Sequence, residues 1–148
     1  MSSGPVDSRQ GSMARTESPL RVLRAVFAFA VLASVVHYGD NFIATDQYPR
    51  SSTVPNPSPE SVLAVWAAFT AAGTAGYVLF RRGRVQGACA ALALYSGSGL
   101  IGLGHYAAGG TSALEWWRHA HIVADIASGV GMLAFVVWVV LSRSDSWA

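Results

Sequence analysis

The chain has 148 residues, of which 52% are apolar and only 12% are charged, with a formal net charge of +2. In soluble domains roughly a quarter of the residues are charged, so this composition argues against a soluble domain. Together with a mean hydropathy of +0.38, it favours one small domain in a lipid bilayer. The single cysteine, Cys89, excludes an internal disulfide and a multi-cysteine metal site.

The chain divides into an N-terminal polar tail, a membrane domain and a short C-terminal tail. Residues 1 to 17 are rich in Ser, Gly, Gln and Arg, which predicts a disordered cytoplasmic tail, with Met1 or Met13 as the start of the protein. Residues 18 to 143 are expected to form a single domain, and residues 144 to 148 a second cytoplasmic tail. Four apolar segments in this domain are long enough to span a bilayer: residues 20–38, 61–80, 85–106 and 113–142, approximately.

Two of these helices have recognisable start signals. Ser58-Pro59-Glu60 is expected to cap the second helix. Ser112 and Glu115 have the spacing of a capping box, which predicts that the last helix begins near Ala113. The connection between the first two helices contains four of the six prolines and is expected to be extended.

The third helix contains a glycine series that formally matches the G-x-G-x-x-G pattern of dinucleotide-binding proteins. No strand precedes Gly97, Gly99 and Gly102, and the segment is predicted to lie in lipid. A dinucleotide site is therefore not expected. Close packing against a neighbouring helix explains these glycines better.

The basic residues define an orientation for the bundle. All ten are arginine, and eight of them fall on one side of a four-span arrangement, whereas only Arg50 and Arg118 fall on the other. The positive-inside rule then predicts that both termini are cytoplasmic, in a multi-pass protein of the inner (plasma) membrane. Because the arginines follow this rule, their placement is explained by the orientation of the protein in a bilayer, and nucleic-acid binding is not expected.

All four histidines are predicted to lie near the extracytoplasmic face of this bundle. His37 shares a helix face with Asp40 and Asn41, and His121 shares one with Asp125 at i+4. His119 points about 200° away from His121 and is left out of the site. A carboxylate such as Asp125 inside an apolar span is costly, so a compensating partner is expected.

The pattern of imidazoles and carboxylates favours a transition-metal site. The candidate ligands are His37, His105, His121 and Asp125, with Asp40 as a further ligand. A haem held non-covalently by two histidines is a variant of this hypothesis.

Two other classes of function stay open. Asp125 and His121 could serve as a metal-free acid/base pair in a small membrane enzyme or transporter. Alternatively, the polar layer fixes helix packing in a structural or partner-binding subunit. Four helices are few for a stand-alone transporter, which is consistent with a homo-oligomer or a larger membrane complex. Neither a reaction nor a substrate follows from the sequence.

The sequence also resembles a group of known but uncharacterised proteins. His37-Tyr38-x-Asp40-Asn41, the proline-rich loop and the late Gly104-His105-Tyr106 resemble four-span membrane proteins of GC-rich, actinobacterial-type bacteria. The resemblance covers residues 20 to 142, approximately, and implies the four-span fold. It implies no activity.

Overall fold

The computed structural model describes residues 7–50, 56–108 and 110–144, and within these ranges the side chains of residues 19 to 143. All regular secondary structure in this part of the chain is helical, which confirms the predicted all-α class. The elements are α1 (Asp7–Ile43), η1 (Thr45–Gln47), α2 (Pro59–Arg81), α3 (Val85–Leu100), α4 (Leu103–Ala107), η2 (Thr111–Ala113) and α5 (Trp116–Ser144).

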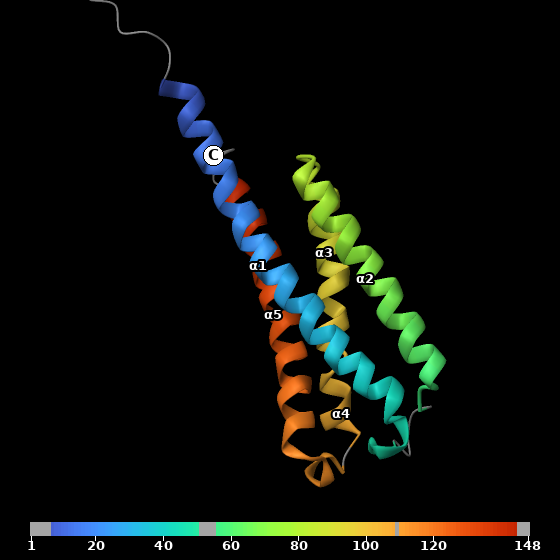
Figure 1. Ribbon diagram of the computed structural model, residues 1–148. Helices are drawn as coiled ribbons and strands as arrows, with labels where there is room; N and C mark the ends of the chain where they lie inside the picture. Colours follow the sequence, from blue (N-terminus) through green and yellow to red (C-terminus); the bar gives the residue numbers. More distant parts are fainter. Residues whose placement is uncertain (1–6, 51–55, 109, 145–148) are drawn as a thin grey trace, which may run out of the picture.

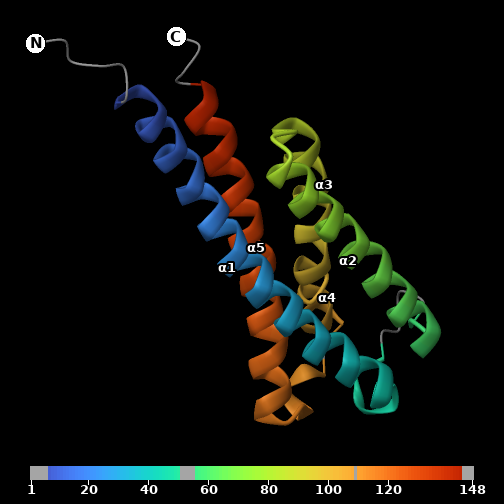
Figure 2. The ribbon, with the colours of Figure 1, turned by 45° about the horizontal axis from the view of Figure 1, so that its top comes forward.

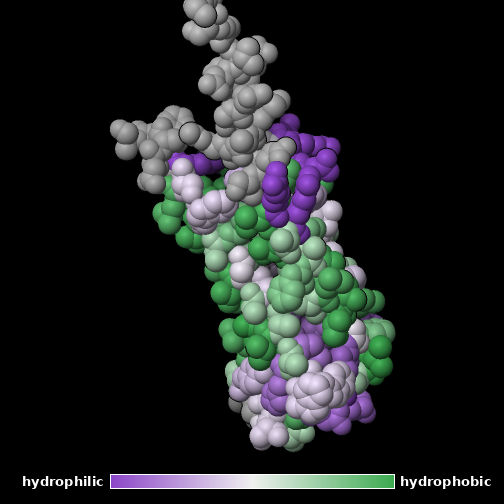
Figure 3. Space-filling view, turned by 60° about the vertical axis from the view of Figure 1, so that its left-hand side comes forward, coloured by the Kyte–Doolittle hydropathy of each residue, from purple (hydrophilic) through white to green (hydrophobic). Residues whose placement is uncertain are grey.

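Four stretches are long and apolar enough to cross a membrane, as predicted. They are Pro19–Ile43, Pro59–Arg81, Val85–Ala107 and Trp116–Arg143. The helices run alternately up and down, so that the start of α1, the α2–α3 turn and the end of α5 lie at one end of the bundle, whereas η1, α4 and η2 lie at the other (Figures 1 and 2). Figure 3 shows a broad apolar surface between these two more polar ends, which is the surface expected of a protein in lipid.

The four long helices form a ring in which α2 packs on α3 and α1, and α5 packs on α3 and α1. The core between them is made of aliphatic and aromatic side chains, including Leu23 of α1, Leu92 and Tyr95 of α3, and Met132 and Phe135 of α5. Helix α2 is the least buried, with only 11% of its span window inside the protein. The chain therefore places α1, α3 and α5 around the core and leaves α2 largely to the bilayer.

Two glycines set the distance between α3 and α5. A β-carbon built on Gly99 would lie 2.2 Å from the carbonyl oxygen of Asp125, and one on Gly129 would lie 2.7 Å from the carbonyl oxygen of Ser96. These separations are too short for any side chain, so the two backbones touch here. The close helix packing predicted for the glycines of the third helix is therefore found at Gly99. A β-carbon on Gly104, by contrast, would meet nothing within 4 Å.

The polar end of the first helix differs from the prediction. Helix α1 continues past residue 38 to Ile43, so His37, Asp40 and Asn41 belong to one continuous helix. At its other end α1 starts at Asp7, so the described part of the predicted disordered tail is helical. Pro19 lies inside this helix, where its ring removes one backbone donor.

The start of α2 agrees with the sequence, but the start of α5 does not. The Ser58 hydroxyl accepts a hydrogen bond from the Ser61 backbone N–H, at 3.3 Å. The capping box predicted at Ser112 does not form: residues 111–113 make the 3₁₀ turn η2, and Leu114 is extended. Helix α5 begins at Trp116 because buried Leu114 packs against Tyr48 and Ile122, which interrupts the helical path.

The third span contains a tighter turn near its end. Helix α3 stops at Leu100, and α4 resumes at Leu103 after a tight turn in which Gly102 N–H donates to the Gly99 carbonyl. The backbone stays right-handed helical at Ile101 and Gly102, so the predicted span over residues 85–106 agrees with the observed Val85–Ala107. The tighter turn lies just before His105.

Candidate functional site

Three histidines from three helices meet at the polar end of the bundle, and we call them the histidine cluster: His37 of α1, His105 of α4 and His121 of α5. The Nδ1 atoms of His37 and His121 lie 3.2 Å apart, and both side chains are buried. The ring of His105 lies 5.2 Å from that of His37, nearly perpendicular to it. Three of the four main candidate ligands therefore lie together, whereas the fourth, Asp125, has no hydrogen bond to them among the described residues.

Asp40 lies behind His121, on the side away from His37. Its Oδ2 atom accepts a hydrogen bond from the Tyr48 hydroxyl at 2.5 Å and lies 3.3 Å from Arg118 Nε. The same oxygen lies 3.5 Å from Nε2 of His121. One carboxylate thus connects α1, the segment after η1 and the start of α5.

Arg118 holds this end of the bundle together. Its Nη2 atom donates to Gln47 Oε1 at 2.5 Å, and its guanidinium lies over the rings of Trp117 and Tyr48, with carbon-to-centroid distances of 4.9 and 5.6 Å. Because Arg118 is buried, the charge of Asp40 balances it at a site with little solvent.

Tyr48, in the segment that follows η1, packs against the histidine cluster. Its ring packs 4.9 Å from that of His105. Burial, followed by the hydrogen bond to Asp40, raises the pKa of the Tyr48 phenol well above its ordinary value. The hydroxyl therefore stays protonated and donates to the carboxylate.

Asn41 is the remaining polar neighbour of His37. Its Nδ2 atom donates to the His37 backbone carbonyl at 3.0 Å and lies 3.2 Å from Nε2 of the same ring. Each ring nitrogen of His37 therefore has a polar neighbour: His121 at Nδ1 and Asn41 at Nε2.

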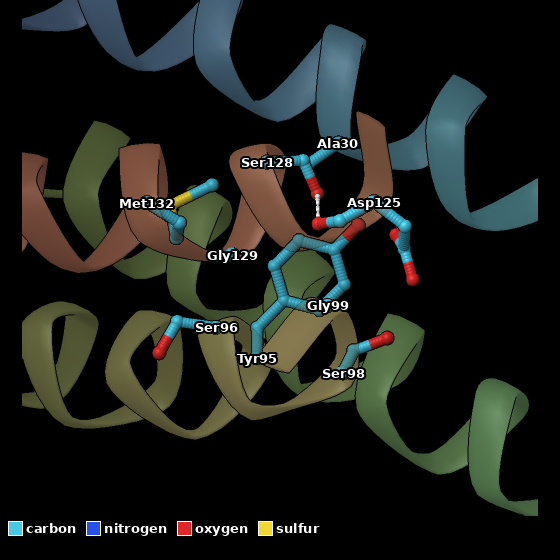
Figure 4. Close-up of a pocket in the computed structure, with 9 residues that line it drawn as sticks. All are labelled: Ala30, Tyr95, Ser96, Ser98, Gly99, Asp125, Ser128, Gly129 and Met132. Atoms are coloured by element: carbon cyan, nitrogen blue, oxygen red, sulfur yellow. Dashed lines mark hydrogen bonds between the residues drawn. The ribbon is translucent and has the colours of Figure 1, made fainter. Parts of the chain in front are cut away.

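Asp125 does not join the contacts of the histidine cluster. Its side chain is fully buried, and neither carboxylate oxygen has a hydrogen-bond partner among the described residues. It lines a separate small cavity between α1, α3 and α5 (Figure 4). The spacing of four residues from His121 puts Asp125 one helical turn further along α5.

His119 lies outside the cluster, as the sequence predicted. Its ring nitrogen Nδ1 lies 3.2 Å from the hydroxyl of Tyr106 in an exposed contact. The Glu115 carboxylate, four residues before His119, accepts a hydrogen bond from the Trp117 indole.

Sequence reasoning missed Arg118, Gln47 and Tyr48 as parts of the site. Arg118 was counted only as a charge on the less basic side. Tyr48 was expected to lie over the outer mouth of the bundle, in the proline-containing connection, but not to contact the histidines. An arginine in the first turn of an apolar span was the one available signal, since such a residue needs a partner. Across the described ranges, no three His, Cys, Asp or Glu side chains are already arranged to hold one metal ion.

Comparison of the chain with protein-family models, with curated proteins and with solved structures found no match. The interpretation of the site therefore rests on its residues alone.

Proposed function

We propose that the histidine cluster binds a divalent transition-metal ion. The observation that carries the proposal is the 3.2 Å separation between the Nδ1 atoms of His37 and His121. Two nitrogens that bind one tetrahedral metal at about 2.0 to 2.1 Å lie roughly 3.3 Å from each other. Both nitrogens are therefore already spaced as two ligands of a single ion.

The environment of His121 supports the same proposal. A metal-binding histidine usually presents its second ring nitrogen to a carboxylate, which orients the ring and increases its basicity. Nε2 of His121 lies 3.5 Å from Asp40 Oδ2, within ion-pair distance although the two atoms are not hydrogen-bonded, and this leaves Nδ1 for the ion. In this proposal Asp40 supports a ligand instead of binding the metal itself.

His105 supplies the third ligand. Its ring lies beside that of His37 on the short helix α4, and a rotation of the side chain would direct a nitrogen towards the other two. Three histidines with one open position form a ligand set typical of zinc and of other borderline metals. An ion fits better than haem, because two axial nitrogens on opposite faces of a haem lie roughly 4 Å apart, twice a metal–nitrogen bond.

A metal-free proton relay is a second candidate, favoured by the order Asp40, His121, His37. If Nε2 of His121 carries a proton towards Asp40, its Nδ1 can accept one from Nδ1 of His37. This arrangement orients an imidazole for general acid or base chemistry.

The test is the metal content of the full-length protein purified in mild detergent, together with its visible spectrum. We expect a near-stoichiometric transition metal that is lost in His37→Ala and in His121→Ala. His119→Ala is the matched control, because it removes an exposed imidazole outside the cluster, and it is expected to keep the metal.

The other outcomes distinguish the alternatives. A metal-free protein that moves protons in vesicles, with loss of that activity in His121→Ala, would contradict the metal proposal and support the relay. A metal-free, inactive protein whose variants lose only thermal stability would support a packing role for the cluster. A Soret band would replace the ion by haem.

We also propose that the end of the bundle opposite the histidine cluster faces the cytoplasm, in a plasma membrane. The α2–α3 turn at that end contains Arg81, Arg82 and Arg84, and the positive-inside rule places such loops in the cytoplasm. The start of α1 and the end of α5 lie at the same end of the bundle as this turn (Figures 1 and 2). Under this proposal the two termini, which lie outside the described residues, are cytoplasmic, and the histidine cluster lies near the opposite face.

A further inference from the structure

Asp125 is the most deeply buried ionisable group with no evident partner. Its relative exposure is 0%, and both carboxylate oxygens lack hydrogen-bond donors within the described structure. The Ser128 hydroxyl, which lies next to it, donates to the Asp125 backbone carbonyl and not to the carboxylate. The dashed line in Figure 4 marks this bond, and the carboxylate projects away from it.

The surroundings of the carboxylate supply no positive charge. The cavity is lined by neutral residues apart from Asp125 itself, including Tyr95, Ser96, Ser98 and Ser128. Arg118 and the histidine cluster are engaged with Asp40 and with each other. An ionised carboxylate in this position would therefore be both desolvated and unpaired, which is strongly unfavourable inside a membrane.

The size of the cavity limits which species could neutralise the negative charge of an ionised Asp125. The space between its lining atoms has no room for the centre of a water molecule. The backbone contact at Gly99 closes it on the α3 side. A metal cation needs its own volume and several oxygen ligands, whereas a proton needs neither.

We infer that Asp125 is a proton-binding site inside the membrane span, separate from the histidine cluster, and that its carboxyl group carries an exchangeable proton while α3 and α5 are packed together. The titratable groups that face it are the phenols of Tyr38 from α1 and Tyr95 from α3. The Tyr38 hydroxyl donates to the Ser98 carbonyl at 2.9 Å, so its proton is already committed. The Tyr95 hydroxyl has no hydrogen-bond partner among the described residues, so it is free to pair with the carboxyl group, but as a neutral phenol it brings no charge to balance an anion. A protonated, neutral Asp125 needs no such counter-charge.

The experiment is labelling with a hydrophobic carbodiimide, which adds to protonated carboxylic acids in apolar surroundings. The carboxyl oxygen bonds to the central carbon of the reagent and the proton moves to its nitrogen, so no further reactant is needed. Full-length protein in mild detergent is labelled over a range of pH in sodium or choline chloride, and the modified residue is identified by peptide mass spectrometry.

We expect labelling of Asp125 that falls at least about tenfold from mildly acidic to alkaline pH, is equal in sodium and choline, and is absent in Asp125→Asn. His37→Ala should keep the label, which separates this site from the metal proposal. Glu60 is the accessibility control, because it lies exposed at the start of α2 and should react with a water-soluble carbodiimide instead.

Two results would overturn the inference. Protection of Asp125 by sodium but not by choline would identify a metal cation as the bound species. Absence of the label at every pH, with an infrared spectrum that lacks a protonated carboxyl band at neutral pH, would show that the group is ionised. Both are read on the wild-type chain, so they hold even if Asp125→Asn fails to fold.

Discussion

The Nδ1 atoms of His37 and His121 lie 3.2 Å apart, although the two residues belong to the first and last long helices of the chain. The contact is possible because α1 and α5 pack directly against each other and because α1 continues as a helix beyond His37. Had α1 ended at Tyr38, Asp40 would not have been fixed behind His121.

Replacing Asp40 with Asn is expected to destabilise the protein by about 3 kcal/mol, because Arg118 would be left buried without its counter-charge. The measurement is thermal unfolding in mild detergent. Asp46→Asn is the matched control, since Asp46 is an exposed acid of η1 and its loss should change the unfolding temperature little. Equal effects of the two substitutions would show that the Asp40–Arg118 pair does not stabilise this end.

Replacing Tyr48 with Phe removes the hydroxyl that donates to Asp40 and should cost about 1 to 2 kcal/mol near neutral pH. The pKa of this phenol is raised in the folded protein, so its contribution is present below about pH 10, the ordinary tyrosine pKa, and is lost as pH rises through the higher folded value. The difference in unfolding temperature between wild type and Tyr48→Phe should shrink above about pH 10. A difference that grows with alkaline pH would contradict this sign.

Replacing Gly99 with Ala should separate α3 from α5, because the new β-carbon would overlap the Asp125 carbonyl oxygen. We expect a loss of about 1 to 3 kcal/mol in thermal unfolding experiments. Gly104→Ala is the control: its β-carbon would meet nothing within 4 Å, and alanine stabilises a helix by about 1 kcal/mol relative to glycine. If both variants behave alike, the close approach of the two backbones is not needed for stability.

The proposed orientation predicts the accessibility of single cysteines introduced into a Cys89→Ala background. Ser142→Cys, at the exposed end of α5, should be shielded from a membrane-impermeant maleimide added to intact cells. Asp46→Cys, in η1 at the opposite end, should react readily. The reverse pattern of labelling would invert the bundle.

The membrane spans could be predicted from the sequence because they depend on hydropathy and length, which the chain displays directly. The meeting of His37 with His121 could be anticipated from their shared depth. The boundaries near Leu114 could not, since Leu114 is extended to pack on Tyr48, a residue from a distant connection. A local capping pattern was overridden by this tertiary contact.

The separation of Asp125 from the histidines shows the limit of reasoning from helix faces. His121 and Asp125 do share a face of α5, but one helical turn along the axis is enough to give them different neighbours. His121 lies beside His37, whereas Asp125 lines the small cavity between α1, α3 and α5. The role of Arg118 was equally inaccessible, because Asp40, Gln47 and Tyr48 reach it only through the folded arrangement of η1 over α5.

The backbone contact at Gly99 and Gly129 also limits relative movement within the bundle. Because the backbones of α3 and α5 touch without intervening side chains, these two helices are expected to shift together as one unit, which carries His121 on α5. His37 belongs to α1, which contacts that unit through side chains. A sliding of α1 by about one or two ångströms would therefore change the distance between the His37 and His121 nitrogens. Under the metal proposal, the affinity of the cluster for its ion would then depend on the position of α1.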